Sequence, residues 1–216
     1  FVDVGFDKDA FLHYTDLSPY IKSIIKFTHD AMNDQHNQFD FAKFESAPEI
    51  VKTGKISEVL NGKPNILVQI LKEPIAAKGP RLTCEISLAG RFVVLTPFNE
   101  IVAVSKKIHS SDERKRLQKM MESIRPKNFG VIVRTAAEGK TTAELHEDLR
   151  TLEANWKNIQ SNLKGAVAPT RIMNEESKTT SILRDLLSED FNKIVVNDKK
   201  IYDITLSYLQ RIAPHK

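Results

Sequence analysis

Three residues in the second half of the chain have the types and the order that end a phosphate-binding loop. Gly139, Lys140 and Thr141 follow the apolar, β-branched run Gly130–Val133, and a helical pattern comes after them. A complete loop needs a glycine five residues before Gly139, because backbone N–H groups must wrap around the phosphates. That position is Arg134. Nucleotide hydrolysis is therefore the least favoured hypothesis, and saturable ATP hydrolysis lost in Lys140→Ala would revive it.

Few other residues are arranged for chemistry by spacing alone. No histidine has a second histidine four residues away or an acidic residue at ligand spacing, so a metal site is not indicated. No serine or cysteine lies in a nucleophile elbow. Cys84 is the single cysteine, which excludes an internal disulfide and suits a reducing compartment. We expect it to be a half-buried strand residue.

A dense group of basic residues lies between Ser105 and Lys127, where eight lysines and arginines accompany three acidic residues. Two interpretations are open. The segment is either a solvated helix with charge pairs at i, i+4, or a surface that attracts nucleic-acid phosphates through counterion release. The basic residues are Lys106, Lys107, Arg114, Lys115, Arg116, Lys119, Arg125 and Lys127.

Two aromatic residues near the N-terminus are candidates for binding. Phe1 and Phe11 lie on neighbouring predicted strands, and Lys78 lies in a loop at the rim of the small barrel that these strands would form. Exposed rings on such a face can stack on bases, at about 1–3 kcal/mol per base, while a lysine holds the backbone. The alternative is that both rings belong to the core.

The composition places the chain among globular proteins. With 216 residues, of which 41% are hydrophobic and 28% charged, it can form one large domain or two small ones. The net charge of +4 mildly favours an anionic partner. No apolar run approaches the roughly 18 residues of a membrane span, and no leader pattern is present. The sequence starts at Phe1 within a strand-like run without an initiator Met, so we expect a piece of a longer chain.

In the first half, short strands bounded by Gly and Pro predict a small closed or nearly closed barrel. These strands are expected at Phe1–Val4, Phe11–His13, Ile66–Leu71 and Leu82–Leu88. Residues 15–53 are polar, with one amphipathic stretch over Ile21–Met32. This segment is long for a connection inside a compact domain, so it is either a functional excursion or partly disordered.

In the second half, strands alternate with capped helices. Capping boxes at Ser110 and Glu113 and at Thr141 and Glu144 predict two helix starts. The first helix ends before Pro126, and the second continues to about Leu163 by its apolar spacing. Strands are expected at Phe92–Leu95, Ile101–Ser105 and Phe129–Arg134; a last unit is predicted as helix Thr179–Leu187, strand Lys193–Val196 and helix Lys200–Ile212.

Two stretches resemble known families. Phe1–Gly5 followed by Phe11–Leu17 is similar to the strand–turn–strand of the RNA-binding OB-fold that recurs in ribosomal protein S-one. Val68–Pro97, which reads VQILKEPIAAKGPRLTCEISLAGRFVVLTP, resembles the N-terminal half of the bacterial RNase E/G endoribonucleases, as do the later stretches SKKIHSSDERKRL and VIVRTAAEGKT. The resemblance follows the family's order over nearly the whole chain and is weakest between Asp16 and Ile50.

The resemblance implies an α+β architecture in three parts. Residues 1–88 would be an OB-fold RNA-binding β-barrel that lacks its first strand and carries a long insertion at 15–53. Residues 89–178 would be an α/β 5′-sensor domain, and residues 179–216 the beginning of an RNase-H-like subdomain. Because the first strand is missing, the barrel is expected to have an unpaired edge.

The resemblance also assigns roles to individual residues. Arg134 and Thr135 match the family's recognition of a 5′-monophosphate, and Gly90 and Val94 match the wall around the terminal nucleotide. Gly139, Lys140 and Thr141 would then form a turn and a helix cap. Phe1, Phe11 and Lys78 match the aromatics and the lysine that hold RNA. Lys106-Lys107 stands where some relatives have Arg-Arg, which removes bidentate geometry there.

The resemblance implies a function for a longer parent protein. It would be a cytoplasmic, homo-oligomeric, Mg²⁺-dependent endoribonuclease that cuts single-stranded RNA in RNA decay and rRNA maturation. Its catalytic aspartates, its Zn-linking cysteines and a second phosphate-binding arginine would lie outside residues 1–216. This chain is then expected to bind single-stranded RNA, preferably 5′-monophosphorylated, and not to cut it. The alternative is a stand-alone, non-catalytic RNA-binding module.

Overall fold

The computed structural model describes residues 1–34, 39–52, 55–76, 78–174, 178–187 and 191–212. The chain forms two compact units, Phe1–Met173 and Asn174–Lys216. The architecture is α+β, as predicted, with two small sheets. The predicted domain boundaries at residues 88 and 178 stay predictions. Within the described ranges, no helix combines the length and apolar character that crossing a bilayer requires.

The N-terminal sheet has three strands in the order β1-β3-β2, namely β1 (Phe11–Leu12), β3 (Arg81–Thr83) and β2 (Gln69–Lys72). β1 is parallel to β3, whereas β2 is antiparallel to it. The predicted strand Phe1–Val4 contributes a single bridge, between Val2 and Ala10. The described strands therefore form an open sheet and no closed barrel, and the OB-fold itself stays a prediction.

The predicted strand Leu82–Leu88 is wrong as one element. The chain leaves the first sheet after Thr83, because the Cys84 N–H donates to the Asp16 carbonyl at 2.9 Å. It enters the second sheet only at β4 (Leu88–Ala89). Cys84 is fully buried directly after β3, so the prediction of a half-buried strand residue is wrong as well.

Most of the segment 15–53 is folded as part of the first unit. Residues 35–38 and Thr53 lie outside the described residues. η1 (Tyr14–Asp16) opens this segment, α1 (Ile21–Met32) and η2 (Phe41–Lys43) lie within it, and α2 (Ile56–Val59) follows it. The predicted amphipathic helix at Ile21–Met32 is confirmed, and its buried face recurs every three or four residues. That face comprises Ile21, Ile24, Phe27, Thr28 and Ala31, with Ser23 beside it.

The central sheet has the order β4-β5-β7-β6, with β5 (Val93–Pro97), β7 (Phe129–Val133) and β6 (Val102–Val104). β7 is antiparallel to β5 and parallel to β6. Along β5, Val93, Leu95 and Pro97 are buried, whereas the residues between them are half-buried. One face of the sheet is thus the core side.

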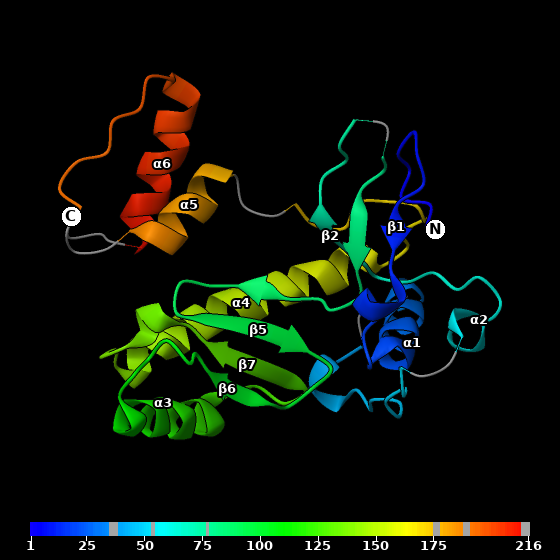
Figure 1. Ribbon diagram of the computed structural model, residues 1–216, viewed down its shortest axis with the longest axis horizontal. Helices are drawn as coiled ribbons and strands as arrows, with labels where there is room; N and C mark the ends of the chain where they lie inside the picture. The colour runs from blue at the N-terminus through cyan, green and yellow to red at the C-terminus, as the bar shows by residue number, and fades with distance from the viewer. Residues whose placement is uncertain (35–38, 53–54, 77, 175–177, 188–190, 213–216) are drawn as a thin grey trace. The chain divides into compact units, whose positions relative to one another are not determined.

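Two helices cover the core side, and both begin near their predicted positions. In Figure 1, α3 (Ser111–Ile124) lies beside β6, and α4 (Thr142–Leu163) runs along β4 and β5. The Thr141 and Glu144 capping box is confirmed in both directions. At α3 only half of the box forms: Ser110 accepts the Glu113 N–H, but the Glu113 carboxylate bonds elsewhere. Leu117, Met121, Leu145, Leu149, Leu152 and Trp156 line the core from these helices.

An aromatic cluster joins α1 to the central sheet. Phe27 of α1 stacks on Trp156 of α4 with ring centroids 5.0 Å apart and an interplanar angle of 25°. Its edge-on contacts are with Phe39, Phe41, Phe44 and Phe98. The Gln160 side-chain amide also donates to the Phe39 carbonyl at 2.7 Å. The described part of segment 15–53, for which an excursion or partial disorder was expected, therefore builds part of the main core.

The second unit consists of α5 (Lys178–Leu186) and α6 (Lys199–Ile212), which lie against each other. Thr180 and Leu183 of α5 and Thr205 and Tyr208 of α6 are buried. The two helices match their predictions, but the strand expected at 193–196 is wrong. Residues 193–196 do not form a strand, and Val195 is 79% exposed. A strand needs a neighbouring strand for its backbone hydrogen bonds, and the described residues of this unit contain none.

Candidate functional site

The candidate site lies at one end of the central sheet, where three connections meet. β6 and β7 both end here, because Val104 pairs with Val133 in parallel register. β5 begins here, because Val93 pairs with Val133 in antiparallel register. The sheet therefore brings together residues 105–107 after β6, residues 134–135 after β7, and the hairpin that precedes β5.

The hairpin between β4 and β5 binds Arg134. The Gly90 N–H donates to the Val93 carbonyl at 2.8 Å and closes the turn. The Arg134 backbone N–H donates to the Phe92 carbonyl at 2.8 Å, and its guanidinium Nη1 donates to the Gly90 carbonyl at 2.8 Å. Arg134 is thus held by its backbone and by its side chain to the same turn. The structure thus brings Gly90 and Arg134 together.

Thr135 and Val94 lie beside this pair. Thr135 is exposed and opens the short helix η3 (Thr135–Ala137). Val94 is half-buried and lies opposite Ile132, which is 44% exposed. Since alternate strand residues share a face, Val94, Ile132 and Arg134 are on the side of the sheet opposite the core. All four predicted pocket residues therefore lie at the same end of the sheet.

Asp148 of α4 holds the turn from the core side. Its carboxylate accepts the backbone N–H groups of Arg91 at 3.1 Å, Phe92 at 2.8 Å and Val93 at 3.0 Å. Its spacing is the one local signal for this role, because Asp148 stands three residues after Leu145 and four before Leu152, on the sheet-facing side of the helix. Sequence reasoning missed it, since its backbone partners lie more than fifty residues away.

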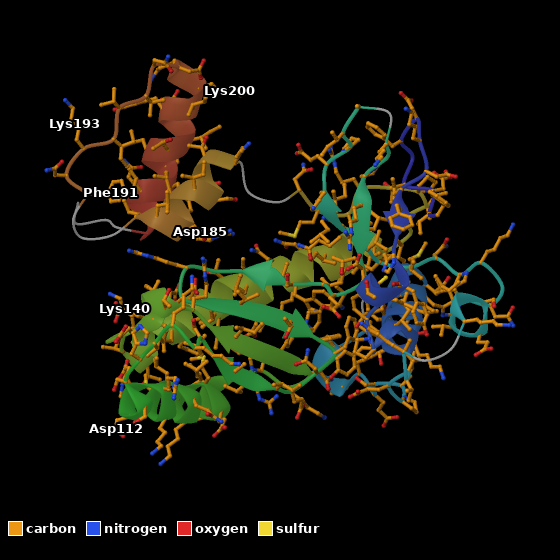
Figure 2. All side chains as sticks on the ribbon, viewed as in Figure 1. Asp112, Lys140, Asp185, Phe191, Lys193 and Lys200 are labelled. Atoms are coloured by element: carbon orange, nitrogen blue, oxygen red, sulfur yellow. The ribbon has the colours of Figure 1, made fainter. Side chains whose placement is uncertain are left out.

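The loop at Gly139 and Lys140 is built as a turn and a helix cap. Gly139 has a φ of +72°, and its N–H donates to the Glu113 carboxylate at 2.9 Å. The Lys140 ammonium pairs with Glu144 at 3.2 Å and lies 5.5 Å from the centre of the Phe92 ring. Figure 2 labels Lys140 and Asp112 on the side of this unit where α4 and α3 begin. The loop therefore links the two helices.

The basic segment separates into two kinds of residue. Arg116 pairs with Glu113 at 2.6 Å, and Arg125 pairs with Glu100 at 3.2 Å. By contrast, several lysines point their charge to solvent; they are Lys106, Lys107, Lys115, Lys119 and Lys127. Lys106 and Lys107 follow β6 at the same end of the sheet as Arg134. Both interpretations of the segment stay open.

The second group of predicted residues lies on the N-terminal sheet. Phe1 is 88% exposed and Phe11 is 41% exposed, with ring centroids 5.7 Å apart, so these rings are not core residues. Lys78 is exposed in the loop between β2 and β3. That loop lies against the strand, because the Phe11 N–H donates to the Pro80 carbonyl at 2.8 Å. The fold thus places an aromatic pair and a lysine loop on neighbouring segments.

The described residues offer little for hydrolytic or metal chemistry. No three His, Cys, Asp or Glu side chains in the described ranges gather so that they could hold a metal ion. Burial raises the pKa of the Cys84 thiol to about 12, so it is protonated at neutral pH and is a poor nucleophile. The Mg²⁺ and Zn²⁺ expected for a longer parent stay predictions.

Comparison with known proteins gives the family. The sequence profile of the Ribonuclease E/G family matches residues 87–216. Ribonuclease G of Haemophilus influenzae is 32% identical over 214 residues, which cover 99% of this chain and 40% of that protein. Ribonuclease G of Escherichia coli K12 is 30% identical over the same length. Ribonuclease E of a Nostoc species is 39% identical over 155 residues, 72% of this chain and 23% of that protein.

The chain therefore belongs to the Ribonuclease E/G family, as the resemblance predicted. It spans about two fifths of the length of these Ribonuclease G relatives and less than a quarter of the Nostoc Ribonuclease E. The activity of a whole protein of this family thus comes to this chain only as a proposal.

The link between the two helices predicts a pH effect on stability. Hydrogen bonds from the Arg116 side chain and from the Gly139 N–H lower the pKa of Glu113 from 4.5 to about 2. A lowered pKa stabilises the fold above the unfolded pKa, and this stabilisation is lost as the pH falls toward the folded pKa. We expect Glu113→Gln to cost about 1 kcal/mol at neutral pH, with the difference from wild type vanishing toward pH 2.

Urea unfolding of both proteins between neutral and acidic pH measures this difference. Glu122→Gln, on the exposed side of the same helix, controls for the loss of a charge without these bonds. A Glu113→Gln cost that stayed constant as the pH fell would show that the carboxylate bonds do not supply the effect.

Proposed function

We propose that this chain is the RNA-recognition part of a single-strand-specific endoribonuclease that senses 5′-monophosphate ends. Membership of the Ribonuclease E/G family supports the RNA substrate. The observation that carries the finer proposal is the fixed Arg134, whose guanidinium is bonded to the Gly90 carbonyl beside the exposed Thr135. An oriented guanidinium next to a hydroxyl is suited to a terminal phosphate.

The proposed chemistry at the pocket is charge-assisted hydrogen bonding. A guanidinium has five N–H donors in a planar fork that matches phosphate oxygens, and the bond to Gly90 fixes the plane of that fork. The Thr135 hydroxyl would donate to a third oxygen. Val94, on the same face of the sheet, would contact the first nucleotide. Bonds of this kind contribute about 1.5–3 kcal/mol each, enough to select one kind of RNA end.

The RNA chain beyond its end would be held on the N-terminal sheet. The exposed rings of Phe1 and Phe11 would stack on bases, and Lys78 would neutralise a phosphate. Such stacking tolerates any sequence, because every base has a π-face. This chain would therefore bind single-stranded RNA with little sequence preference but with a preference for the chemistry of the 5′ end.

Cleavage would be the work of a longer parent protein. We propose that the parent acts in RNA decay and rRNA processing in the cytoplasm as a homo-oligomer, with Mg²⁺ for cleavage and Zn²⁺ at the link between subunits. In this chain we assign binding residues only, and we expect it to bind RNA without cutting it.

The role of Arg134 predicts a loss of end discrimination in Arg134→Ala. Fluorescence anisotropy would compare a short labelled RNA bearing a 5′-monophosphate with the same RNA bearing a 5′-hydroxyl, at two salt concentrations. We expect wild type to prefer the monophosphate by about tenfold or more, and Arg134→Ala to bind both ends alike. Arg134→Lys should restore little, because an ammonium cannot form the bidentate contact.

Arg150→Ala is the matched control, because Arg150 is an exposed arginine on α4. If it removed the preference as completely as Arg134→Ala, general charge attraction would explain the result and the pocket assignment would fail. Equal binding of both ends by wild type, with binding lost in Phe11→Ala, would leave an RNA clamp without an end sensor.

A further inference from the structure

We infer that Asp148 is the positioning residue of this pocket. Its carboxylate holds the Gly90–Val93 turn, and this turn orients the Arg134 guanidinium. The inference rests on the proposed function of Arg134. Asp148 lies on a helix behind the turn, and its negative charge alone would exclude it from an anion site.

The first support is the convergence of three donors on one carboxylate. Asp148 Oδ2 accepts the N–H groups of Phe92 and Val93, and Oδ1 accepts that of Arg91. Val93 is fully buried and Phe92 nearly so, so water cannot replace these bonds without opening the turn. A carboxylate that accepts several backbone N–H groups fixes their direction, because each bond is charge-assisted and directional.

The second support is the rigidity of the element that carries the carboxylate. α4 extends over 22 residues, and the fully buried Leu145 and Leu149 on either side of Asp148 anchor it to the core. The carboxylate therefore occupies a fixed position relative to the sheet. The turn packs closely against the carboxylate, since a Cβ added at Gly90 would lie 2.5 Å from Asp148 Oδ2.

The third support is that the held turn supplies two of the bonds that Arg134 makes. The Phe92 carbonyl accepts the Arg134 backbone N–H, and the Gly90 carbonyl accepts guanidinium Nη1. A shift of the turn would therefore move both the start of the side chain and its tip. Asp148 thus acts on Arg134 through two hydrogen bonds on opposite sides of one turn.

Charge and position predict opposite results for Asp148→Asn, which keeps the shape of the side chain. Removing a negative charge near an anion site should by itself tighten phosphate binding. The amide nitrogen, however, cannot accept an N–H. If it replaces Oδ1, the bond from Arg91 is lost, and if it replaces Oδ2, those from Phe92 and Val93 are lost. The positioning role therefore predicts weaker discrimination.

The test uses the 5′-monophosphate and 5′-hydroxyl RNAs together with NMR of the protein without RNA. We expect Asp148→Asn to lower the preference for the monophosphate about tenfold and to leave affinity for the hydroxyl end unchanged. Without RNA, the Arg91, Phe92 and Val93 amides should exchange faster, and the Arg134 guanidinium signals should show freer rotation. Glu147→Gln removes the same charge from the neighbouring, exposed position and should change neither measurement.

A second variant, Asp148→Glu, keeps the charge and displaces the carboxylate by one methylene. It should also lose discrimination, and it supplies the test if Asp148→Asn does not fold. Unchanged Arg134 signals and an unchanged preference in a folded variant would overturn the positioning role. Loosened Arg134 signals, with no preference even in wild type, would support the link from Asp148 to Arg134 and overturn the phosphate function instead.

Discussion

Phe27→Ala is expected to lower the free energy of unfolding of the first unit by about 3–5 kcal/mol. The ring is fully buried, stacks on Trp156 and lies at the centre of the aromatic cluster described above. Its removal would leave a cavity among rigid rings that cannot collapse to fill it. Trp156 is the only tryptophan, so its fluorescence during urea unfolding reports on the same cluster.

The matched control is Phe6→Ala, the same change at a ring that is 55% exposed, where we expect little effect. Phe27→Leu should cost less than Phe27→Ala, because the cavity is smaller. If Phe27→Ala cost no more than Phe6→Ala, α1 would not be part of the main core. Residues 15–53 would then be an excursion, as one sequence-based interpretation proposed.

The sequence predicted best what is encoded locally. The Thr141 and Glu144 box specifies a helix start within four residues, and the structure shows both of its hydrogen bonds. The amphipathic spacing of Ile21–Met32 similarly defined α1 without any knowledge of its partner. In each case the information lies within a single helix, so local propensity and tertiary packing agree.

The wrong predictions concern segments whose structure is decided by their hydrogen-bond partners. Lys193–Val196 has the β-branched composition of a strand, but no strand in the described part of its unit offers hydrogen bonds to it. Leu82–Leu88 alternates apolar and polar residues as one strand would, yet the Cys84 N–H donates to the Asp16 carbonyl and not to a strand of the sheet. At the start of α3, the Glu113 carboxylate accepts bonds from Arg116 and Gly139, so it does not accept the backbone N–H of Ser110 that would complete the capping box.

The candidate site shows the same difference between what can be predicted from the sequence and what depends on distant partners. Gly90, Val94, Arg134 and Thr135 were found by resemblance, and the sheet register places them together. Asp148 was missed, although its spacing puts it on the buried side of α4, because its role depends on backbone N–H groups of a distant turn. A side chain that accepts backbone N–H groups distant in the sequence leaves no local spacing pattern, unlike the Thr141 and Glu144 box, so only the fold reveals it.

Gly90→Ala is expected to destabilise the first unit by about 2–3 kcal/mol and to remove the preference for 5′-monophosphate RNA. The added Cβ would lie 2.5 Å from Oδ2 and 2.7 Å from Oδ1 of Asp148. Either the carboxylate moves and leaves three N–H groups without their acceptor, or the turn moves and takes the Gly90 carbonyl away from Arg134. Urea unfolding and RNA anisotropy measure the two effects on the same sample.

A double-mutant cycle with Asp148→Ala separates this collision from other causes. In that background the space opposite the new Cβ is open, so Gly90→Ala should cost clearly less than in wild type, with a coupling of about 1–2 kcal/mol. Gly139→Ala is the control for backbone strain alone, since φ is +72° there and no atom lies within 4 Å of an added Cβ. It should lower stability by about 1 kcal/mol and leave the RNA preference intact. Additive costs in the cycle would mean that the turn does not press on Asp148, and the path from α4 to Arg134 would lose its physical basis.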